Sequence, residues 1–302
     1  MHLEALTAGI GADARAFTGA VHSVFARGCN IELASGTLLG LVARDVGAVP
    51  RGFQLATPDR FAFLDHIHAG APIACRAGLL RIEHSALSID LRPAIPWRSH
   101  LDKYPIACDR PDVAAAWRAA WTALVVHGGA VPLQRQAGDA IATLVRAART
   151  LRPESAPDAI ARLIGLGDGL TPAGDDFLVG FLAGLWGLPK SAERRVFRTA
   201  LTVAIATAVS GTGAISRLYL EAATAGEVSQ SLAALAGAIG RGDANETASA
   251  VATALAVGDS SGAAASYGLL LAVRAVEPAI RPVAESRPSL SPKRDATRRS
   301  GK

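Results

Sequence analysis

The chain has 302 residues, half of them hydrophobic and only 5% aromatic, and it carries a formal net charge of +5. A chain of this length can bury a sizeable core in one or two domains, and its many Ala and Gly residues favour closely packed helices over a fibrous or disordered structure. Much of the basic excess lies in the tail from residue 281 to 302, so the net charge does not indicate a nucleic-acid partner.

Cysteine usage and hydropathy predict a cytoplasmic protein that does not bind a membrane. Cys29, Cys75 and Cys108 are far apart in the sequence and form no closely spaced pair, which is typical of free thiols. The chain does not open with the basic and apolar pattern of a signal peptide. The longest uncharged apolar stretch of the central segment, residues 177–188, is too short to cross a bilayer, which needs about 20 residues.

The first third of the chain has the pattern of short strands. Residues 1 to about 20 are mixed and predict only a short helix or an arm. Alternating apolar and polar residues with frequent turns follow at residues 21–27, 30–33, 37–42, 53–55, 78–83 and 87–91. Short strands at this spacing are typical of a small antiparallel sheet or barrel, which we assign to residues 1–104.

Beyond a predicted linker at residues 105–111, helical periodicity replaces the strand pattern. The predicted helices span residues 113–127, 137–149, 157–164, 172–187, 191–210, 216–225, 228–239, 245–257 and 263–277. Trp117 and Trp121 lie four apart on the first of these helices and are predicted to belong to the core. The fold class is therefore α+β, with a small N-terminal antiparallel β domain followed by an all-α domain at residues 112–282. The basic residues 284–302 are predicted to be disordered.

The most unusual segment runs from residue 164 to 186. Three glycines stand there at alternate positions, Gly165, Gly167 and Gly169. Glycine permits positive φ and close approach of the backbone to a ligand. Thr171 is a suitable N-cap and Pro172 a suitable first helical residue, so a helix is predicted to begin at this point. Gly180 and Gly184 lie four apart inside this helix, which is more typical of close helix packing than of a ligand site.

Two further loops of small residues, at 210–213 and 258–262, also precede predicted helices. Loops of this kind present backbone N–H groups beside the positive end of a helix dipole, so three of them that converged would form an anion site. The ligand-binding candidates are Gly165, Gly167, Gly169, Thr171, Gly174, Ser216, Arg217, Ser260, Ser261 and Gly262.

Asp175 and Asp176, in the first turn of the central helix, are the catalytic candidates. Adjacent helical residues point about 100° apart, so only one of the two carboxylates is expected to face a ligand. We assign Asp175 mainly to the cap and Asp176 to the ligand or to a Mg²⁺ ion. Asp168, inside the glycine loop, disfavours simple phosphate cradling and favours contact with a metal or an amine. His66 and His68 would share one face of a strand, but no third metal ligand accompanies them.

Residues 165–176 read Gly-Leu-Gly-Asp-Gly-Leu-Thr-Pro-Ala-Gly-Asp-Asp. This long motif resembles the signature of a bacterial family first described as a domain of unknown function, one member of which is the AllH-type subunit of oxamate carbamoyltransferase in allantoin degradation. The resemblance covers most of residues 20–280. The sequence departs from the family pattern at Ala263 and Ala264, where the family tends to carry an aromatic residue and an acid, so an acid role at this loop is not implied.

The resemblance implies a subunit of a multi-protein transferase that moves a carbamoyl group between oxamate and phosphate. Such a subunit would bind a small anion and would be active only with its partner subunits; Mg²⁺ is a candidate cofactor. The residues themselves leave two alternatives open. One is a non-catalytic scaffold or binding subunit. The other is a nucleotide-dependent small-molecule kinase, although the glycine loop lacks a convincing lysine.

Overall fold

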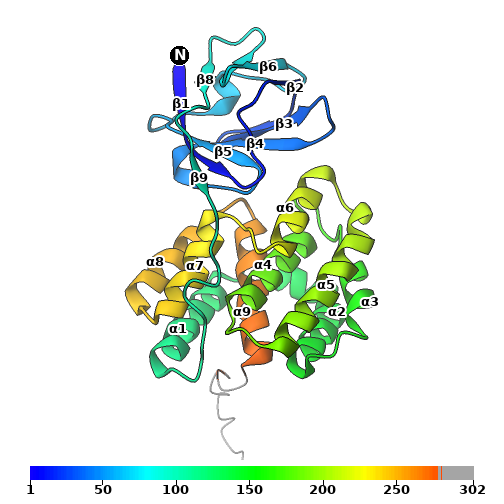
Figure 1. Cartoon of the computed structure of the whole chain (residues 1–302). Helices are drawn as coiled ribbons and strands as arrows, with labels where there is room; N and C mark the ends of the chain where they lie inside the picture. Colours follow the sequence, from blue (N-terminus) through cyan, green and yellow to red (C-terminus); the bar gives the residue numbers. More distant parts are fainter. Residues whose placement is uncertain (278–279, 281–302) are drawn as a thin grey trace, which may run out of the picture.

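Strands and helices form two stacked bodies. The computed structural model describes residues 1–277 and residue 280. Figure 1 shows the strands packed above the helices, and the chain passes from one body to the other after its last strand. Each body has its own buried hydrophobic cluster. The tail predicted to be disordered lies outside the described residues, and the separate folding of the two predicted domains stays a prediction.

Eight strands close into a barrel. Their hydrogen-bonding order is β5-β4-β3-β2-β6-β7-β8-β1, and β1 also pairs with β5, which completes the ring; β9 adds to β1 as a ninth strand. The strands are β1 (His2–Gly9), β2 (Phe17–Phe25), β3 (Gly28–Leu33), β4 (Leu38–Val42), β5 (Gly52–Leu55), β6 (Pro72–Arg76), β7 (Leu79–Ile82), β8 (Ser88–Asp90) and β9 (Ile95–Trp97). Fully buried side chains such as Leu41, Leu80 and Ile89 form its core.

The predicted antiparallel character of this domain is wrong, because the barrel is mixed. β1 pairs in parallel with β8 and β9, and β4 pairs in parallel with β5. Residues 2–9, predicted as a helix or an arm, instead form β1 and close the ring between β8 and β5. Alternation along the sequence indicates that a segment is a strand, but it does not identify a partner far away in the chain.

The remainder of the described chain is helical, and the predicted helices are confirmed to within a few residues at most ends. The α-helices are α1 (Pro111–His127), α2 (Val131–Thr150), α3 (Ala156–Leu163), α4 (Ala173–Gly187), α5 (Ala192–Ala208), α6 (Ala214–Thr224), α7 (Gln230–Arg241), α8 (Ala244–Leu255) and α9 (Ser261–Val276). α2 begins earlier than predicted and is kinked at Ala137, whose φ is −129°. Trp117 and Trp121 stack with ring centroids 5.3 Å apart within the helical core, as predicted.

Helices α4 and α9 pack against each other through glycine. A Cβ added at Gly180 would lie only 1.8 Å from the carbonyl oxygen of Ala265, and one at Gly268 would lie 2.0 Å from the carbonyl oxygen of Phe177. Gly184 makes a similar approach one turn further along α4. The predicted packing role of these glycines is confirmed. Because one small-residue loop precedes α4 and another precedes α9, this packing also holds the two loops close together.

Polar contacts fix the barrel to the helices. Gln230, at the start of α7, exchanges two hydrogen bonds with Ala48: its backbone N–H donates to the Ala48 carbonyl, and its Oε1 accepts from the Ala48 N–H, both at 2.8 Å. The buried carboxylate of Glu227 accepts from Arg98 at 2.8 Å and from the Ser99 backbone N–H at 3.0 Å. These contacts join the barrel to the helical body at two places.

Candidate functional site

The glycine loop between α3 and α4 depends on residues that lack a side chain. Gly165, Gly167 and Gly169 have φ values of 73°, 118° and 87°, which other residues rarely adopt. A Cβ at Gly165 would lie 2.6 Å from the carbonyl oxygen of Gly211, and one at Gly167 would lie 2.9 Å from the backbone nitrogen of Ala173. Gly169 has no heavy atom within 4 Å of its Cβ position. The loop is therefore tightly packed at its base and borders open space at Gly169.

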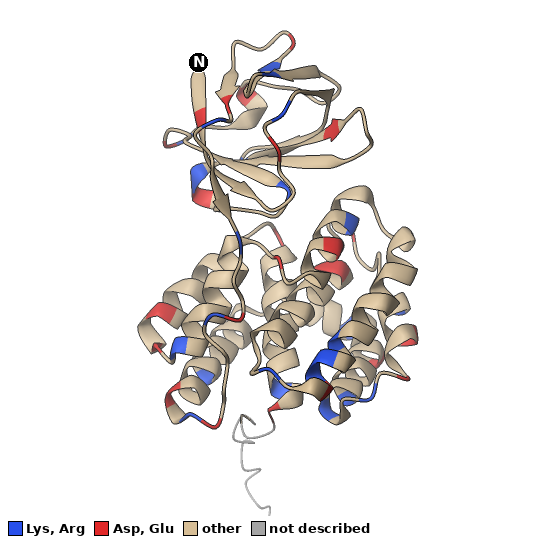
Figure 2. Cartoon of the chain, in the orientation of Figure 1, with Lys and Arg blue, Asp and Glu red and all other residues tan. Residues whose placement is uncertain are grey.

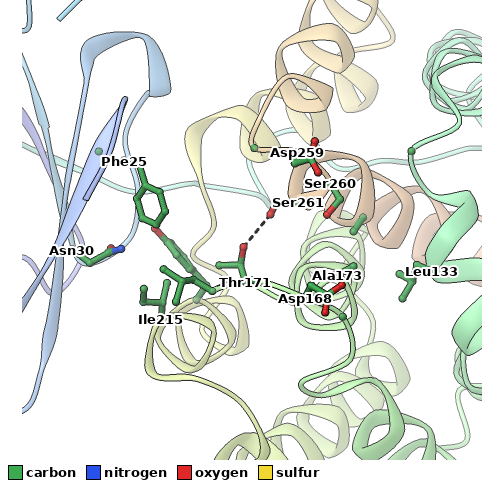
Figure 3. Close-up of a pocket in the computed structure, with 18 of the residues that line it drawn as sticks. Phe25, Asn30, Leu133, Asp168, Thr171, Ala173, Ile215, Asp259, Ser260 and Ser261 are labelled. Atoms are coloured by element: carbon green, nitrogen blue, oxygen red, sulfur yellow. Dashed lines mark hydrogen bonds between the residues drawn. The ribbon is translucent and has the colours of Figure 1, made fainter. Parts of the chain in front are cut away.

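The central helix does not use Thr171 as its N-cap, and that prediction is wrong. Helix α4 begins at Ala173 with Pro172 at the N-cap position. The residue before a proline is disfavoured in helical conformation, and the N-cap position of α4 has no side-chain cap hydrogen bond. The Thr171 Oγ1 lies 3.0 Å from Oγ of Ser261, the first residue of α9 (Figure 3). Thr171 thus joins the glycine loop to the loop that precedes α9.

Asp175 holds the glycine loop to the segment before α6. Its side chain is buried; Oδ1 accepts the Gly165 backbone N–H at 2.9 Å, and Oδ2 accepts the Thr212 hydroxyl at 2.5 Å. Each carboxylate oxygen therefore has a partner inside the protein. This environment matches the structural role assigned to Asp175 and leaves it no free face for a ligand.

Asp176 has the opposite environment. It is half-buried as a residue, but its Oδ2 is inaccessible and has no hydrogen-bond partner among the described residues. Burial, aided by the charge of Asp175, raises the pKa of Asp176 to about 7, although hydrogen bonds from the hydroxyls of Ser261 and Thr171 oppose the rise. A carboxyl group with this pKa is present in both protonation states near neutral pH.

A cleft of about 770 Å³, which we call the outer cavity, lies between the barrel and the helices. Figure 3 shows Phe25 and Asn30 on the barrel side, facing Asp168, Thr171 and the loop before α9. Its lining residues are Phe25, Gly28, Cys29, Asn30, Leu41, Val42, Gly129, Pro132, Leu133, Gln136, Gly167, Asp168, Gly169, Leu170, Thr171, Ala173, Ile215, Tyr219, Gly258, Asp259, Ser260, Ser261 and Ala264. Two of the three small-residue loops therefore converge on one space.

A second cavity of about 280 Å³, which we call the inner cavity, adjoins the first. Five residues line both spaces: Val42, Thr171, Tyr219, Gly258 and Ser261. The remaining lining residues of the inner cavity are Val46, Val49, Asp176, Val179, Val228, Ser229, Ser231, Leu232, Ala254, Val257, Gly262 and Ala265. Asp176 is the one acidic side chain among them, and the contact between Thr171 and Ser261 stands where the two cavities meet.

The predicted site residues separate into three groups. Gly167, Gly169, Thr171, Ser260 and Ser261 line the outer cavity, while Thr171, Asp176, Ser261 and Gly262 line the inner one. Gly165, Gly174, Asp175 and Ser216 line neither cavity; a Cβ at Gly174, for example, would be 2.1 Å from the Leu163 carbonyl oxygen, and the buried Ser216 hydroxyl donates to the Leu170 carbonyl at 3.5 Å. Arg217 is exposed and lines neither cavity.

Charge is unevenly distributed around the cleft. No Lys or Arg of the described residues lines either cavity, whereas Asp168, Asp176 and Asp259 do. Figure 2 shows the same trend, since the Lys and Arg of the helical body gather mainly toward the end farther from the barrel. The cleft offers backbone donors and hydroxyls to a ligand, but within the described part of the chain it offers no cationic side chain.

Two side chains in the cleft were not predicted from the sequence to be near the glycine loop. Burial, aided by the charge of Asp176, raises the pKa of Tyr219 to about 12, so its hydroxyl stays protonated and can donate a hydrogen bond. Cys29, on β3, also lines the outer cavity, and burial raises the pKa of its thiol to about 12. A thiol with this pKa is a poor nucleophile. No local sequence pattern marks either residue, because each reaches the cleft only through the packing of the barrel on the helices.

Metal ligands are not clustered in the described part of the chain. No group of three or more His, Cys, Asp or Glu side chains there could hold a metal ion by itself. His66, considered as a ligand together with His68, instead stacks on the ring of Phe61 with centroids 4.9 Å apart. A Mg²⁺ ion at Asp176 would therefore depend on hydroxyl, water or substrate oxygens for its other ligands.

Fold and cleft together define a two-body protein in which a closed β barrel and a helical bundle enclose a cavity of small-molecule size. The chain belongs to the AllH family: residues 5–96 match the model of the AllH family N-terminal domain, and residues 163–273 match that of oxamate carbamoyltransferase subunit AllH. The family predicted from residues 165–176 is thereby confirmed. Neither the curated proteins nor the solved structures gave a significant match. Within the described residues, no helix is both long enough and apolar enough to cross a membrane.

Proposed function

We propose that this chain is a subunit of an oxamate carbamoyltransferase complex and that its outer and inner cavities hold the reacting groups. Membership of the AllH family supports the first part. The second part rests on one observation above all: Asp176 lines a preformed cavity, and its buried Oδ2 has no hydrogen-bond partner among the described residues. Buried polar groups nearly always have a partner in native proteins, so an exception of this kind points to a missing ligand.

The transfer requires one proton to move at the nitrogen of oxamate. Toward carbamoyl phosphate, a phosphate oxygen attacks the carbamoyl carbon of N-carbamoyl oxamate, the bond from that carbon to the oxamate nitrogen breaks, and the nitrogen gains a proton. In reverse, the oxamate nitrogen loses a proton as it attacks carbamoyl phosphate. Asp176, whose pKa is raised to about 7, can give the proton in one direction and take it in the other near neutral pH.

The charge that develops on the carbonyl oxygen and on phosphate needs stabilisation. The donors that line the outer cavity include backbone N–H groups of the glycine loop, the side-chain amides of Asn30 and Gln136, and the hydroxyls of Thr171, Tyr219, Ser260 and Ser261. Since no Lys or Arg of the described residues lines it, the remaining positive charge would come from Mg²⁺ bound by Asp176 and substrate oxygens, or from a basic side chain of another subunit. The second source would account for a chain that needs partners to be active.

The proposal is tested by carbamoyl transfer in the assembled complex. The chain is co-purified with its partner subunits, and phosphate-dependent cleavage of N-carbamoyl oxamate is measured for wild type, Asp176→Asn and Asp139→Asn. Asp139 is exposed on α2 and lines neither cavity, so its variant controls for the change of charge. We expect Asp176→Asn to lower kcat by about 10²–10⁴, the usual contribution of a general acid or base, and Asp139→Asn to leave kcat unchanged.

Two results would redirect the proposal. An Asp176→Asn complex with nearly full kcat would remove Asp176 from the chemistry. The partner subunits are also assayed without this chain. If they transfer carbamoyl groups at the full wild-type rate, only the scaffold role, in which the chain binds its partners, would remain. A kinase role gains no support, because the glycine loop contains no lysine and none lines the cavities within the described residues.

A further inference from the structure

The inner cavity differs chemically from the outer one. Six valines, together with Leu232, Ala254 and Ala265, make its walls mainly apolar. Its polar groups are the Asp176 carboxyl group and the hydroxyls of Thr171, Tyr219, Ser229, Ser231 and Ser261. This composition is that of a pocket for an apolar group that carries a few hydrogen-bonding atoms.

The charge of a ligand decides whether it can enter. A carboxylate or phosphate in the inner cavity would lie beside Asp176 without a cationic partner among the described lining residues, and burial of an unpaired anion is strongly unfavourable. An uncharged amide has no such penalty. Its NH₂ group can donate to the carboxyl group of Asp176, and its carbonyl can accept from a neighbouring hydroxyl of the lining.

The junction between the cavities fits a ligand that spans both. Thr171 and Ser261 border both spaces, and their side-chain oxygens lie 3.0 Å apart there. Each hydroxyl can turn from this contact to a ligand that lies beside the pair. The outer cavity is larger and borders the backbone of the glycine loop, so the polar end of the same molecule has room there; Asp168 and Asp259 also line it, so a negative charge at that end needs a cation from outside the described lining.

We infer that the inner cavity binds an uncharged amide or ureido group attached to a small apolar substituent, with Asp176 and the hydroxyls of Thr171 and Ser261 as its polar partners. The anionic end of the ligand stays in the outer cavity. In carbamoyl transfer this places the carbamoyl end inward and the carboxylate or phosphate outward, an assignment that rests on the proposed function. Amide binding by the inner cavity does not depend on it.

The experiment compares two probes of the same shape on the full chain. Isovaleramide and isovalerate differ in an amide against a carboxylate, and their dissociation constants at pH 8 are measured by ligand-observed NMR titration. Isovaleramide is expected to bind at least about tenfold more tightly to wild type. In Asp176→Asn the difference between the probes should fall to within about threefold, because the negative charge that rejects isovalerate is gone.

Filling variants locate the binding. Val257→Phe, from the chain just after α8, and Val46→Phe, from the barrel side, each place a ring in the inner cavity, whereas Val126→Phe lies on an exposed position of α1. Either filling variant that folds should weaken isovaleramide at least about tenfold, and Val126→Phe should not. Equal binding of both probes to wild type, or isovaleramide binding unchanged in both filling variants, would overturn the inference.

Failure of this inference is distinguishable from failure of the proposed function. If isovaleramide behaves as expected but the assembled complex transfers no carbamoyl group, the inner cavity remains an amide site and the proposed reaction is wrong. If the amide does not bind while Asp176→Asn abolishes carbamoyl transfer, the reaction stands and the assignment of the inner cavity is wrong.

Discussion

The two sides of the first turn of α4 place neighbouring carboxylates in contrasting environments. On one side, Asp175 is buried and both of its oxygens accept hydrogen bonds from the backbone of Gly165 and the hydroxyl of Thr212. On the other, Asp176 lines a cavity, and its buried Oδ2 has no hydrogen-bond partner among the described residues. The same residue type in the same turn therefore serves architecture at one position and remains available for a ligand at the next. The difference arises from what packs against each face.

The largest effect of Asp176→Asn should be the loss of carbamoyl transfer. The next largest should be a change in how the stability of the protein depends on pH. In the folded protein the pKa of Asp176 is raised to about 7 from its ordinary value of 3.8. Between these values the folded state binds the proton more tightly, so stability falls as pH rises, by up to about 1.4 kcal/mol for each pH unit. Above pH 7 the carboxyl group is ionised in both states, so stability no longer changes with pH and the folded state keeps the full cost of the buried charge. Asn cannot titrate, so Asp176→Asn should lose this slope and be the more stable protein at pH 8.

Urea unfolding of wild type and Asp176→Asn at pH 4, 5, 6, 7 and 8 isolates the effect, since the contributions of all other groups cancel in the difference. Parallel stability curves for the two proteins would mean that Asp176 titrates normally and is well hydrated, contrary to the buried environment of its Oδ2.

Asp175→Asn should act in the opposite sense. The amide NH₂ group of Asn cannot accept a hydrogen bond, so one of the two donors to Asp175 would be left buried and unpaired. We expect a loss of about 1–3 kcal/mol in the free energy of unfolding at pH 7. Chemical denaturation measures it, with the exposed Asp139→Asn as the control. Unchanged stability in Asp175→Asn would contradict the structural role of this carboxylate.

A smaller loss of stability is expected from a substitution at Thr171, which borders both cavities. Thr171→Val keeps the shape of the side chain but removes its contact with Ser261, which should cost about 0.5–1.5 kcal/mol of unfolding free energy. Thr253→Val is a suitable control, because the Thr253 hydroxyl is exposed and bonds only within its own helix, to the Ser249 carbonyl. Equal losses in both variants would show that the contact with Ser261 adds nothing specific.

The smallest effect should come from Asp168, which is exposed in the glycine loop. Removal of this charge in Asp168→Asn should change stability by no more than about 0.5 kcal/mol, as is usual for surface substitutions. Phosphate binding, followed by isothermal titration, should tighten by up to about fivefold because a nearby negative charge is lost. Weaker phosphate binding would instead indicate that Asp168 contributes to the site, for example through a metal.

Local patterns predicted the helices well but not the barrel's topology. Apolar periodicity and helix caps depend on residues that are close in the sequence. Ser191, for instance, accepts a hydrogen bond from the Arg194 backbone N–H at the predicted start of α5. The strand pairings are not local: β1 begins the chain and pairs in parallel with β8, near the end of the barrel. Even a correct list of strands therefore could not distinguish a mixed barrel from an antiparallel one.

The candidate site was predictable to a similar degree. The glycine spacing and the paired carboxylates identified the loop and α4, because their chemistry is concentrated within a short segment. The sequence did not show that Pro172 rather than Thr171 occupies the cap, or that Phe25 and Asn30 face the loop from the barrel. Those features depend on how the two bodies pack against each other, which contacts such as that between Gln230 and Ala48 determine.

The glycine contacts between α4 and α9 also limit how far the two loops at the cleft can move relative to each other. Gly180 lies roughly 10 Å along the axis from the start of α4, at 1.5 Å per residue. A methyl group at Gly180 would lie 1.8 Å from the Ala265 carbonyl oxygen. To relieve this clash, α4 and α9 would have to separate, and their N-terminal ends would move apart. The displacement would be felt at Thr171 and Ser261, whose oxygens now lie 3.0 Å apart. Gly180, which lines neither cavity, thus determines how close the starts of α4 and α9 lie to each other.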